Sequence, residues 1–245
     1  SLLVGAVTQG SRSAADSQFA SAQTQHRSGG AARKKFDEGG AAPDQGTAES
    51  LRLAVKKYEE ALSLWRAIGD RRSEAITLNN IGLVYYSLGE NQKALDCHTK
   101  ALPLRRAVGD RNGEAATLNN IGLVHYSLGD YRKALDFFTR ALPLLRAAGD
   151  RRLEAITLNN IGEVYRSLGE NQKSLGFYNQ ALPLRRAVGD RNGEATTLNN
   201  IGLVHYSLGD NQKSIDYYNQ ALPLLRAGGD RNREAKTLDN IGLVY

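Results

Sequence analysis

The sequence contains no methionine, one cysteine and one tryptophan among 245 residues. The single cysteine, Cys97, excludes an intrachain disulfide and leaves the redox compartment open. No stretch approaches the roughly 20 apolar residues of a membrane-spanning helix, so no membrane span is predicted. The absence of methionine even at position 1 is typical of a fragment or a processed chain.

The sequence also lacks the patterns that carry catalysis. No nucleophile–base–acid set, phosphate-binding loop or metal-ligand spacing is present, so we predict no catalytic residue, no metal, no cofactor and no enzyme activity. His125 and His205 lie two repeats apart, about 20 Å or more if helix layers are 8–10 Å thick. They are predicted to stand in for the tyrosines at Tyr85 and Tyr165 rather than to bind zinc.

The net charge is +6, with a sequence pI near 9.4, but no block of like charge occurs. Arginines such as Arg71 and Arg111 directly follow an aspartate, which partly neutralises them. Nucleic acid is therefore not predicted as a partner. The net positive charge is compatible with an acidic or carboxylate-bearing peptide as a ligand near the groove.

What the sequence does contain is a 40-residue unit that recurs without insertion or deletion. A Gly-Asp pair marks each copy, at Gly69-Asp70, Gly109-Asp110, Gly149-Asp150, Gly189-Asp190 and Gly229-Asp230. A fixed period in this range predicts a solenoid, in which each unit buries its apolar face against its neighbours. Such proteins usually present surfaces to other proteins.

Each unit reads as two antiparallel helices, called A and B. In the copy from Arg71 to Asp110, apolar residues at 3-and-4 spacing predict helix A over about 72–87. Gly89 ends helix A, and helix B extends to about residue 108. The mid-helix glycine, Gly82 in this copy, predicts that helix B crosses helix A closely there, since glycine otherwise costs about 1 kcal/mol. Each B helix also contains an internal proline, for which a kink is predicted.

These residues resemble the tetratricopeptide repeat (TPR). The resemblance rests on Leu78-x-x-Ile81-Gly82-x-x-Tyr85, Leu88-Gly89, Ala94, Ala101 and Leu104. The period is 40 rather than the family's usual 34, and leucine stands where the family often has tryptophan. The "TLNNIG" start of helix A is similar to kinesin light chains and to bacterial TPR proteins that carry a CHAT protease. The resemblance implies an all-α, right-handed superhelical solenoid of antiparallel helix pairs.

Two domains are predicted. Residues 1–46 form a low-complexity N-terminal segment, with weak helical stretches near Ala14–His26 and Ala31–Glu38. Its composition predicts a flexible tail, and the alternative is a segment that is ordered by packing on a partner or neighbour. Residues 47–245 form the solenoid. Its parts are a half-repeat at 47–70, full repeats at 71–110, 111–150, 151–190 and 191–230, and a half-repeat at 231–245.

By resemblance, the A helices line a concave groove, and their paired asparagines read the backbone of a bound peptide, as in kinesin light chains. An amide both donates and accepts, which suits this role. The alternative is that one asparagine of each pair bonds a neighbouring helix and sets the repeat spacing. The predicted groove residues are Asn79, Asn80, Leu83, Tyr86, Asn119, Asn120, Leu123, Tyr126, Asn159, Asn160, Glu163, Arg166, Asn199, Asn200, Leu203 and Tyr206. Glu163 and Arg166 interrupt the apolar pattern and are expected to pair as ions, either in solvent or as a contact that sets ligand register.

The leading prediction is a protein-interaction scaffold that binds a peptide or helix in this groove. One alternative is a self-assembling structural protein, a homo-oligomer or filament formed by head-to-tail stacking of the two half-repeats. Another is a sensor fragment of a larger CHAT-type protease. An adaptor would be cytoplasmic and a filament extracellular.

Overall fold

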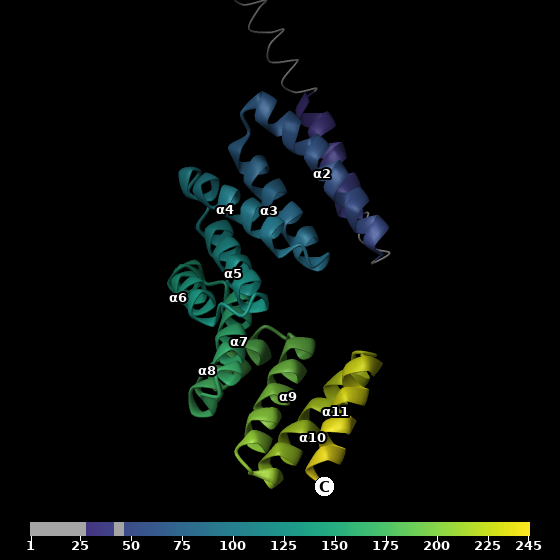
Figure 1. Ribbon diagram of the computed structural model, residues 1–245, viewed down its shortest axis with the longest axis vertical. Coiled ribbons are helices and arrows are strands. Elements are labelled where there is room, and N and C mark those ends of the chain that lie inside the picture. The colour runs from purple at the N-terminus through teal and green to yellow at the C-terminus, as the bar shows by residue number, and fades with distance from the viewer. Residues whose placement is uncertain (1–27, 42–46) are drawn as a thin grey trace, which may run out of the picture. The chain divides into compact units, whose positions relative to one another are not determined.

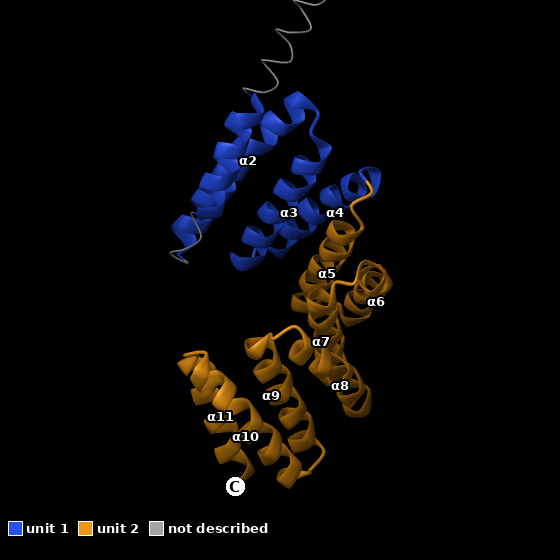
Figure 2. Ribbon diagram, turned by 180° about the vertical axis from the view of Figure 1, so that it is seen from behind, with its two compact units in different colours: residues 1–108 blue, residues 109–245 orange. Residues whose placement is uncertain are grey.

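The computed structural model describes residues 28–41 and 47–245, and every regular element in these ranges is helical (Figure 1). The chain divides into two compact units, residues 1–108 and 109–245 (Figure 2). The described part of unit 1 holds a helix at 28–41, α2 (Ala48–Ile68), α3 (Arg71–Ser87) and α4 (Asn91–Ala107). Unit 2 holds α5 (Arg111–Ser127), α6 (Tyr131–Ala148), α7 (Arg151–Ser167), α8 (Asn171–Ala187), α9 (Arg191–Ser207), α10 (Asn211–Ala227) and α11 (Arg231–Val244).

Within each unit the helices pack in sequence order, which is the arrangement of a helical solenoid. The A helices are α3, α5, α7, α9 and α11, and the B helices are α2, α4, α6, α8 and α10. The A helices α3, α5, α7 and α9 each pack against the B helix that follows in the same repeat, and α11 packs against the B helix before it, α10. The predicted all-α solenoid of helix pairs is confirmed.

Short Gly-containing loops separate the helices and hold them antiparallel. The loop glycines adopt the left-handed conformation, with φ of 74° at Gly89 and 66° at Gly109, where a side chain would be strained. The aspartate after the glycine caps the next A helix. The Asp70 carboxylate accepts from the Ser73 amide at 3.0 Å, and Asp150 accepts from the Leu153 amide at 2.9 Å.

The mid-helix glycines lie where a ring from helix B presses on helix A, as predicted. A Cβ at Gly82 would lie 2.6 Å from the His98 ring, and a Cβ at Gly162 would lie 2.6 Å from the Tyr178 ring. Gly122 faces Phe138 and Gly202 faces Tyr218 in the same way. Glycine is required at this crossing because any side chain would collide with a buried ring.

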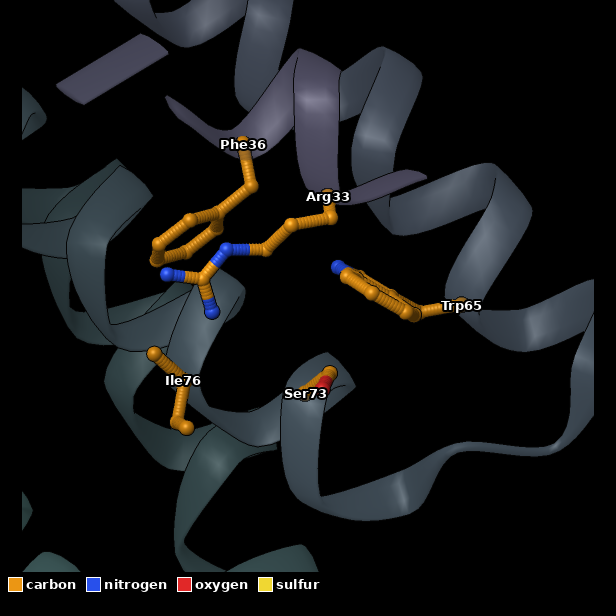
Figure 3. Close-up of a pocket in the computed structure, with 5 residues that line it drawn as sticks. All are labelled: Arg33, Phe36, Trp65, Ser73 and Ile76. Carbon is orange, nitrogen blue, oxygen red and sulfur yellow. The ribbon is translucent and has the colours of Figure 1, made fainter. Parts of the chain in front are cut away.

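The helix at 28–41 is an A-type partner for α2. Ala32 is fully buried, and a Cβ at Gly39 would lie 2.8 Å from the Tyr58 ring, the contact that Gly82 makes with His98. Phe36 and Trp65 lie near each other where this helix meets α2 (Figure 3). The helix predicted at Ala31–Glu38 is therefore present, is longer, and packs across the boundary predicted at residue 46. The stretch 14–26 lies outside the described residues.

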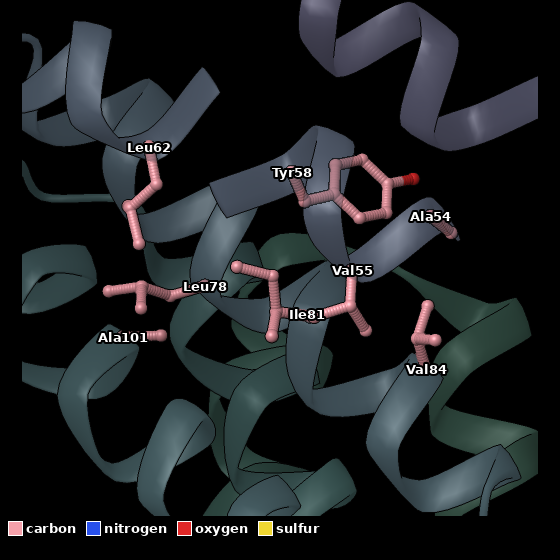
Figure 4. Packing of buried hydrophobic residues seen from close by; sticks show 8 residues of the cluster. All are labelled: Ala54, Val55, Tyr58, Leu62, Leu78, Ile81, Val84 and Ala101. Carbon is pink, nitrogen blue, oxygen red and sulfur yellow. The ribbon is translucent and has the colours of Figure 1, made fainter. Parts of the chain in front are cut away.

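The core of unit 1 is a layer of small and branched side chains between helices. Figure 4 shows Val55 and Tyr58 of α2 facing Ile81 and Val84 of α3. The B helices α4, α6, α8 and α10 continue through their prolines. These prolines are exposed, so the carbonyl that loses its hydrogen-bond donor lies near solvent.

Candidate peptide-binding face

The A helices of unit 2 follow one another along one side of the solenoid, with α5 against α7, α7 against α9, and α9 against α11. We use the term A face for the side chains of these helices that lie at and around the predicted groove positions. It is built by the periodic "TLNNIG" segment, because positions 3, 4 and 7 residues apart share one side of a helix. The site is therefore repeated, with small differences, in each copy.

In unit 2 the first asparagine of each pair links consecutive A helices. Asn119 is 3% exposed, and its Oδ1 accepts from Thr157 Oγ1 at 3.1 Å and from Asn160 Nδ2 at 3.2 Å. Asn159 accepts from the next helix in the same way, at 3.3 Å from Thr197 Oγ1 and 3.4 Å from Asn200 Nδ2. This ladder of amides and hydroxyls fixes the spacing of the repeats.

Two further first-position asparagines also bond another helix, Asn199 the next A helix and Asn79 the B helix of its own repeat. Asn199 exchanges hydrogen bonds with Thr237 at 2.9 and 3.1 Å. In unit 1, Asn79 is 9% exposed and its Oδ1 lies 3.1 Å from His98 Nδ1. Burial places Asn79 and Asn119 between helices rather than on the surface. For Asn119 this is the alternative role, setting repeat spacing, and we assign no direct ligand contact to Asn79 or Asn119.

The other predicted groove positions are more accessible. Leu83 in unit 1 and Tyr206 in unit 2 are exposed. The half-buried positions are Asn80 and Tyr86 in unit 1, and Asn120, Leu123, Tyr126, Asn159, Asn160, Asn199, Asn200 and Leu203 in unit 2. The A face thus combines amides with leucine and tyrosine side chains.

Glu163 and Arg166 pair as predicted, but the pair is built into the fold rather than solvated. The Glu163 carboxylate accepts from Arg166, from Tyr126 of α5 at 3.2 Å and from Tyr178 of α8 at 2.8 Å. Burial raises the pKa of Glu163, but the hydrogen bonds from Arg166 and Tyr178 outweigh it and hold that pKa below its ordinary value. The carboxylate therefore ties three helices together.

A depression of about 180 Å³ opens on the A face between α9 and α11. It brings together the predicted residues Asn199, Asn200 and Leu203. Its other lining residues are Thr196, Arg233, Lys236, Thr237 and Asn240. Arg233 is anchored there, with Nη1 donating to Thr196 Oγ1 at 3.2 Å and Nε 3.4 Å from the Asp230 carboxylate. The depression therefore offers amides, one apolar side chain and two cations.

Two kinds of residue in or beside this depression were absent from the predicted site, although the sequence carries a signal for each. Thr197 and Thr237 belong to a threonine that recurs two positions before the first asparagine, at the same period as the asparagines. Arg233 and Lys236 depart from their copies, where Gly193 and Thr196 stand one repeat earlier. Comparing the copies position by position would have identified these cations.

The histidines play the predicted packing role. His125 stacks on Phe137, and His205 on Tyr217, each with ring centroids 5.4 Å apart. Tyr165 stacks on Phe177 with the same distance of 5.4 Å between ring centroids. Across residues 28–41 and 47–245, no three His, Cys, Asp or Glu side chains gather as metal ligands. In the same ranges, no helix combines the length and apolarity that a membrane span requires.

Several solved structures share this arrangement of helices. RapI in its apo form is 19% identical with a TM-score of 0.78, over 87% of this chain and 77% of that chain. Aspartyl phosphate phosphatase F from Bacillus subtilis is 18% identical with a TM-score of 0.80, over 93% of this chain and 59% of that chain. A Rap protein complexed with competence and sporulation factor is 16% identical with a TM-score of 0.73, over 86% of this chain and 61% of that chain.

At these identities the likeness shows the fold alone, and this chain spans less than two thirds of the last two proteins. No curated protein matches the sequence. The tetratricopeptide repeat family matches residues 48–107, 73–147, 153–227 and 194–245, which together span most of the chain. The helix pairs, the glycine crossings and this match agree, and the chain belongs to the tetratricopeptide repeat family.

Proposed function

We propose that the chain is a protein-interaction scaffold whose A face in unit 2 binds an extended peptide carrying an acidic residue. The observation that carries this proposal is the depression between α9 and α11, where Asn200, Leu203, Arg233 and Lys236 converge. Each of these groups suits one part of an extended acidic peptide. The amide can bond the peptide backbone, the leucine can contact an apolar side chain, and the two cations can pair with a carboxylate.

The rest of the A face extends this binding surface toward α5. The second asparagines Asn160 and Asn200 are half-buried, and each uses one amide hydrogen to hold the preceding A helix. The carbonyl and the second hydrogen of each amide are the groups that we assign to the peptide backbone. Each such bond contributes about 0.5–1.5 kcal/mol net, so several repeats must act together for micromolar affinity. The solved Rap conjugation gene regulator of the plasmid pLS20, in complex with the Phr* peptide, supports a peptide as the ligand class.

The cations favour an acidic peptide over a neutral one. Lys236 is exposed, and Arg233 is oriented by Thr196 and Asp230. Asp230 cancels part of the charge of Arg233, so Lys236 carries most of the preference. Because the site is open to solvent, we expect binding to weaken as salt is added, as for other exposed charges.

The test is a random peptide display selection on the whole chain, followed by anisotropy titrations of the selected peptides. We expect acidic peptides to be enriched. We expect Lys236→Glu and Leu203→Glu each to weaken binding at least tenfold. Arg132→Glu, an exposed charge reversal on helix α6, is the matched control and should bind like the unchanged chain. Equal binding by all three variants would exclude the A face as the site.

A further inference from the structure

A second, smaller pocket lies in unit 1, where the helix at 28–41 meets α2 and α3. It has a volume of about 50 Å³, the size of a small functional group. Arg33, Phe36, Trp65, Ser73 and Ile76 line it (Figure 3). It is separate from the A face of unit 2, and the inference drawn from it goes beyond the proposed function.

Trp65 supplies a buried hydrogen-bond donor without an acceptor. The residue is 7% exposed, and its Nε1 has no hydrogen-bond partner within the described part of the chain. In Figure 3 the nitrogen edge of the indole points toward Arg33, into the space that the five residues enclose. Buried donors in folded proteins are nearly always paired, so this N–H indicates a missing acceptor.

Arg33 supplies a cation at the entrance. Its side chain is 69% exposed, its Nε lies 3.0 Å from the Asp37 carboxylate, and its guanidinium lies 5.6 Å from the centroid of the Phe36 ring. Figure 3 shows the two terminal nitrogens of Arg33 on the side of Ile76 and Ser73. These nitrogens point into the pocket, while Nε faces Asp37.

The acidic groups around the pocket already have partners. Asp37 is paired with Arg33. Asp70 caps α3, accepting from the Ser73 amide at 3.0 Å and from the Ser73 hydroxyl at 2.8 Å. The donors that remain are the indole N–H and the terminal guanidinium N–H groups, and they are set between the apolar walls of Phe36 and Ile76.

We propose that this pocket binds a carboxylate, with Trp65 Nε1–H donating to one oxygen and the Arg33 guanidinium donating to the other. Two converging donors, one of them charged, match the two oxygens of a carboxylate, and the volume admits little more than that group. The site is particular to this position. The later copies place arginine or leucine where Trp65 stands, and asparagine where Phe36 stands, so they offer no indole N–H.

The only tryptophan of the chain makes the proposal directly measurable. The full chain, labelled with ¹⁵N, gives one indole N–H peak by NMR, and acetate, N-acetylglycine and N-acetylaspartic acid amide serve as probes. We expect each probe to shift this peak saturably in the millimolar range. N-acetylglycine and N-acetylaspartic acid amide compare a chain-terminal carboxylate with a side-chain carboxylate. Sodium chloride and the neutral N-acetylglycine amide should leave the peak in place.

Substitutions at exposed arginines complete the test. Arg33→Gln should weaken the carboxylate response at least fivefold, while Arg52→Gln, an exposed position on α2, should leave it unchanged. Because both side chains are exposed, both variants should fold like the unchanged chain. A peak that does not move with any carboxylate would overturn the proposal, and the pocket would then hold water only. An equal shift with chloride, or an unchanged response in Arg33→Gln, would overturn it as well.

Discussion

Protonation of His98 is expected to destabilise unit 1 as the pH falls below about 6.5. The His98 ring is fully buried, its flat face lies against Gly82, and its Nδ1 lies 3.1 Å from Asn79 Oδ1. If Nδ1 donates to that oxygen, the ring is neutral and Nε2 is a bare acceptor, with no hydrogen-bond partner in the described part of the chain. A second proton would place an unpaired N–H and a charge in the core. Burial therefore lowers the pKa of His98 from 6.5 to about 4.

The sign and size of the effect follow from this difference. Because the folded pKa lies below the unfolded pKa, the unfolded state binds the proton more tightly. The stabilisation is fully present above pH 6.5 and is lost as the pH falls toward 4. Between pH 7.5 and 5, a shift of this size removes about 2 kcal/mol from the free energy of unfolding, and the full loss near pH 4 is about 3 kcal/mol.

The assay is urea denaturation of the chain, monitored by the fluorescence of Trp65. This residue lies in the same unit as His98 and therefore reports the unfolding of unit 1. The informative variant is His98→Phe, because Phe138 occupies the equivalent position against Gly122 in the next copy. We expect the unchanged chain to lose about 2 kcal/mol more than His98→Phe between pH 7.5 and 5, since phenylalanine has no proton to bind. Carboxylates titrate equally in both proteins and cancel in the comparison.

His205→Tyr is the matched control. His205 lies in unit 2, and tyrosine is the residue at its equivalent position in the copy that holds Tyr165. This variant should leave the pH dependence of the Trp65 transition unchanged. If His98→Phe loses as much stability between pH 7.5 and 5 as the unchanged chain does, His98 is not the titrating group and the argument from its burial is wrong.

Three further predictions test the packing, two of them with a matched control substitution. Gly162→Ala should destabilise unit 2 by about 3 kcal/mol in chemical denaturation, because its Cβ would lie 2.6 Å from a buried ring. Gly176→Ala, with open space around it, should instead stabilise by up to about 1 kcal/mol. Glu163→Gln should cost about 2 kcal/mol by calorimetry, since it weakens three hydrogen bonds. Glu170→Gln, at an exposed ion pair, should cost less than about 0.5 kcal/mol. Asn119→Ala should cost about 1–2 kcal/mol by thermal melting, and no loss would contradict the spacing role.

Much of the fold could be predicted from the sequence because each repeat contains the same helix-ending, helix-capping and helix-contact residues. Glycine at the loops and aspartate at the caps predict helix ends to within one or two residues. The mid-helix glycine predicts the ring contact across the pair. The helix at 28–41 was predicted only as a weak stretch, because the segment has few apolar residues and its contact glycine is displaced. Nineteen residues separate Gly39 from Tyr58, whereas sixteen separate Gly82 from His98.

The candidate site was predicted less completely than the fold. Neighbouring asparagines point about 100° apart on a helix, so the pair by itself does not say which amide faces a ligand. The answer depends on a threonine 38 residues further along, as in the bond from Thr157 to Asn119. The surroundings of Glu163 were equally hidden, because its partners Tyr126 and Tyr178 come from two other helices. Assembly through the ends of the solenoid stays a prediction, as does the domain boundary at residue 46.

Residues that differ between the copies are the ones that we expect to determine binding specificity. A solenoid unit contacts only its neighbours, so a residue that recurs in every copy mainly serves packing, whereas a change in one copy alters only the local surface. Arg233 and Lys236 of α11 add charge to the depression, and the hydrogen bond between Asn119 and Asn160 is unaffected. Trp65 likewise adds a hydrogen-bond donor, its indole N–H, to the pocket in unit 1. Replacing such a residue by the one in the preceding copy, as in Lys236→Thr, should therefore remove a binding preference at little cost in stability. Calorimetry paired with peptide titration would measure both.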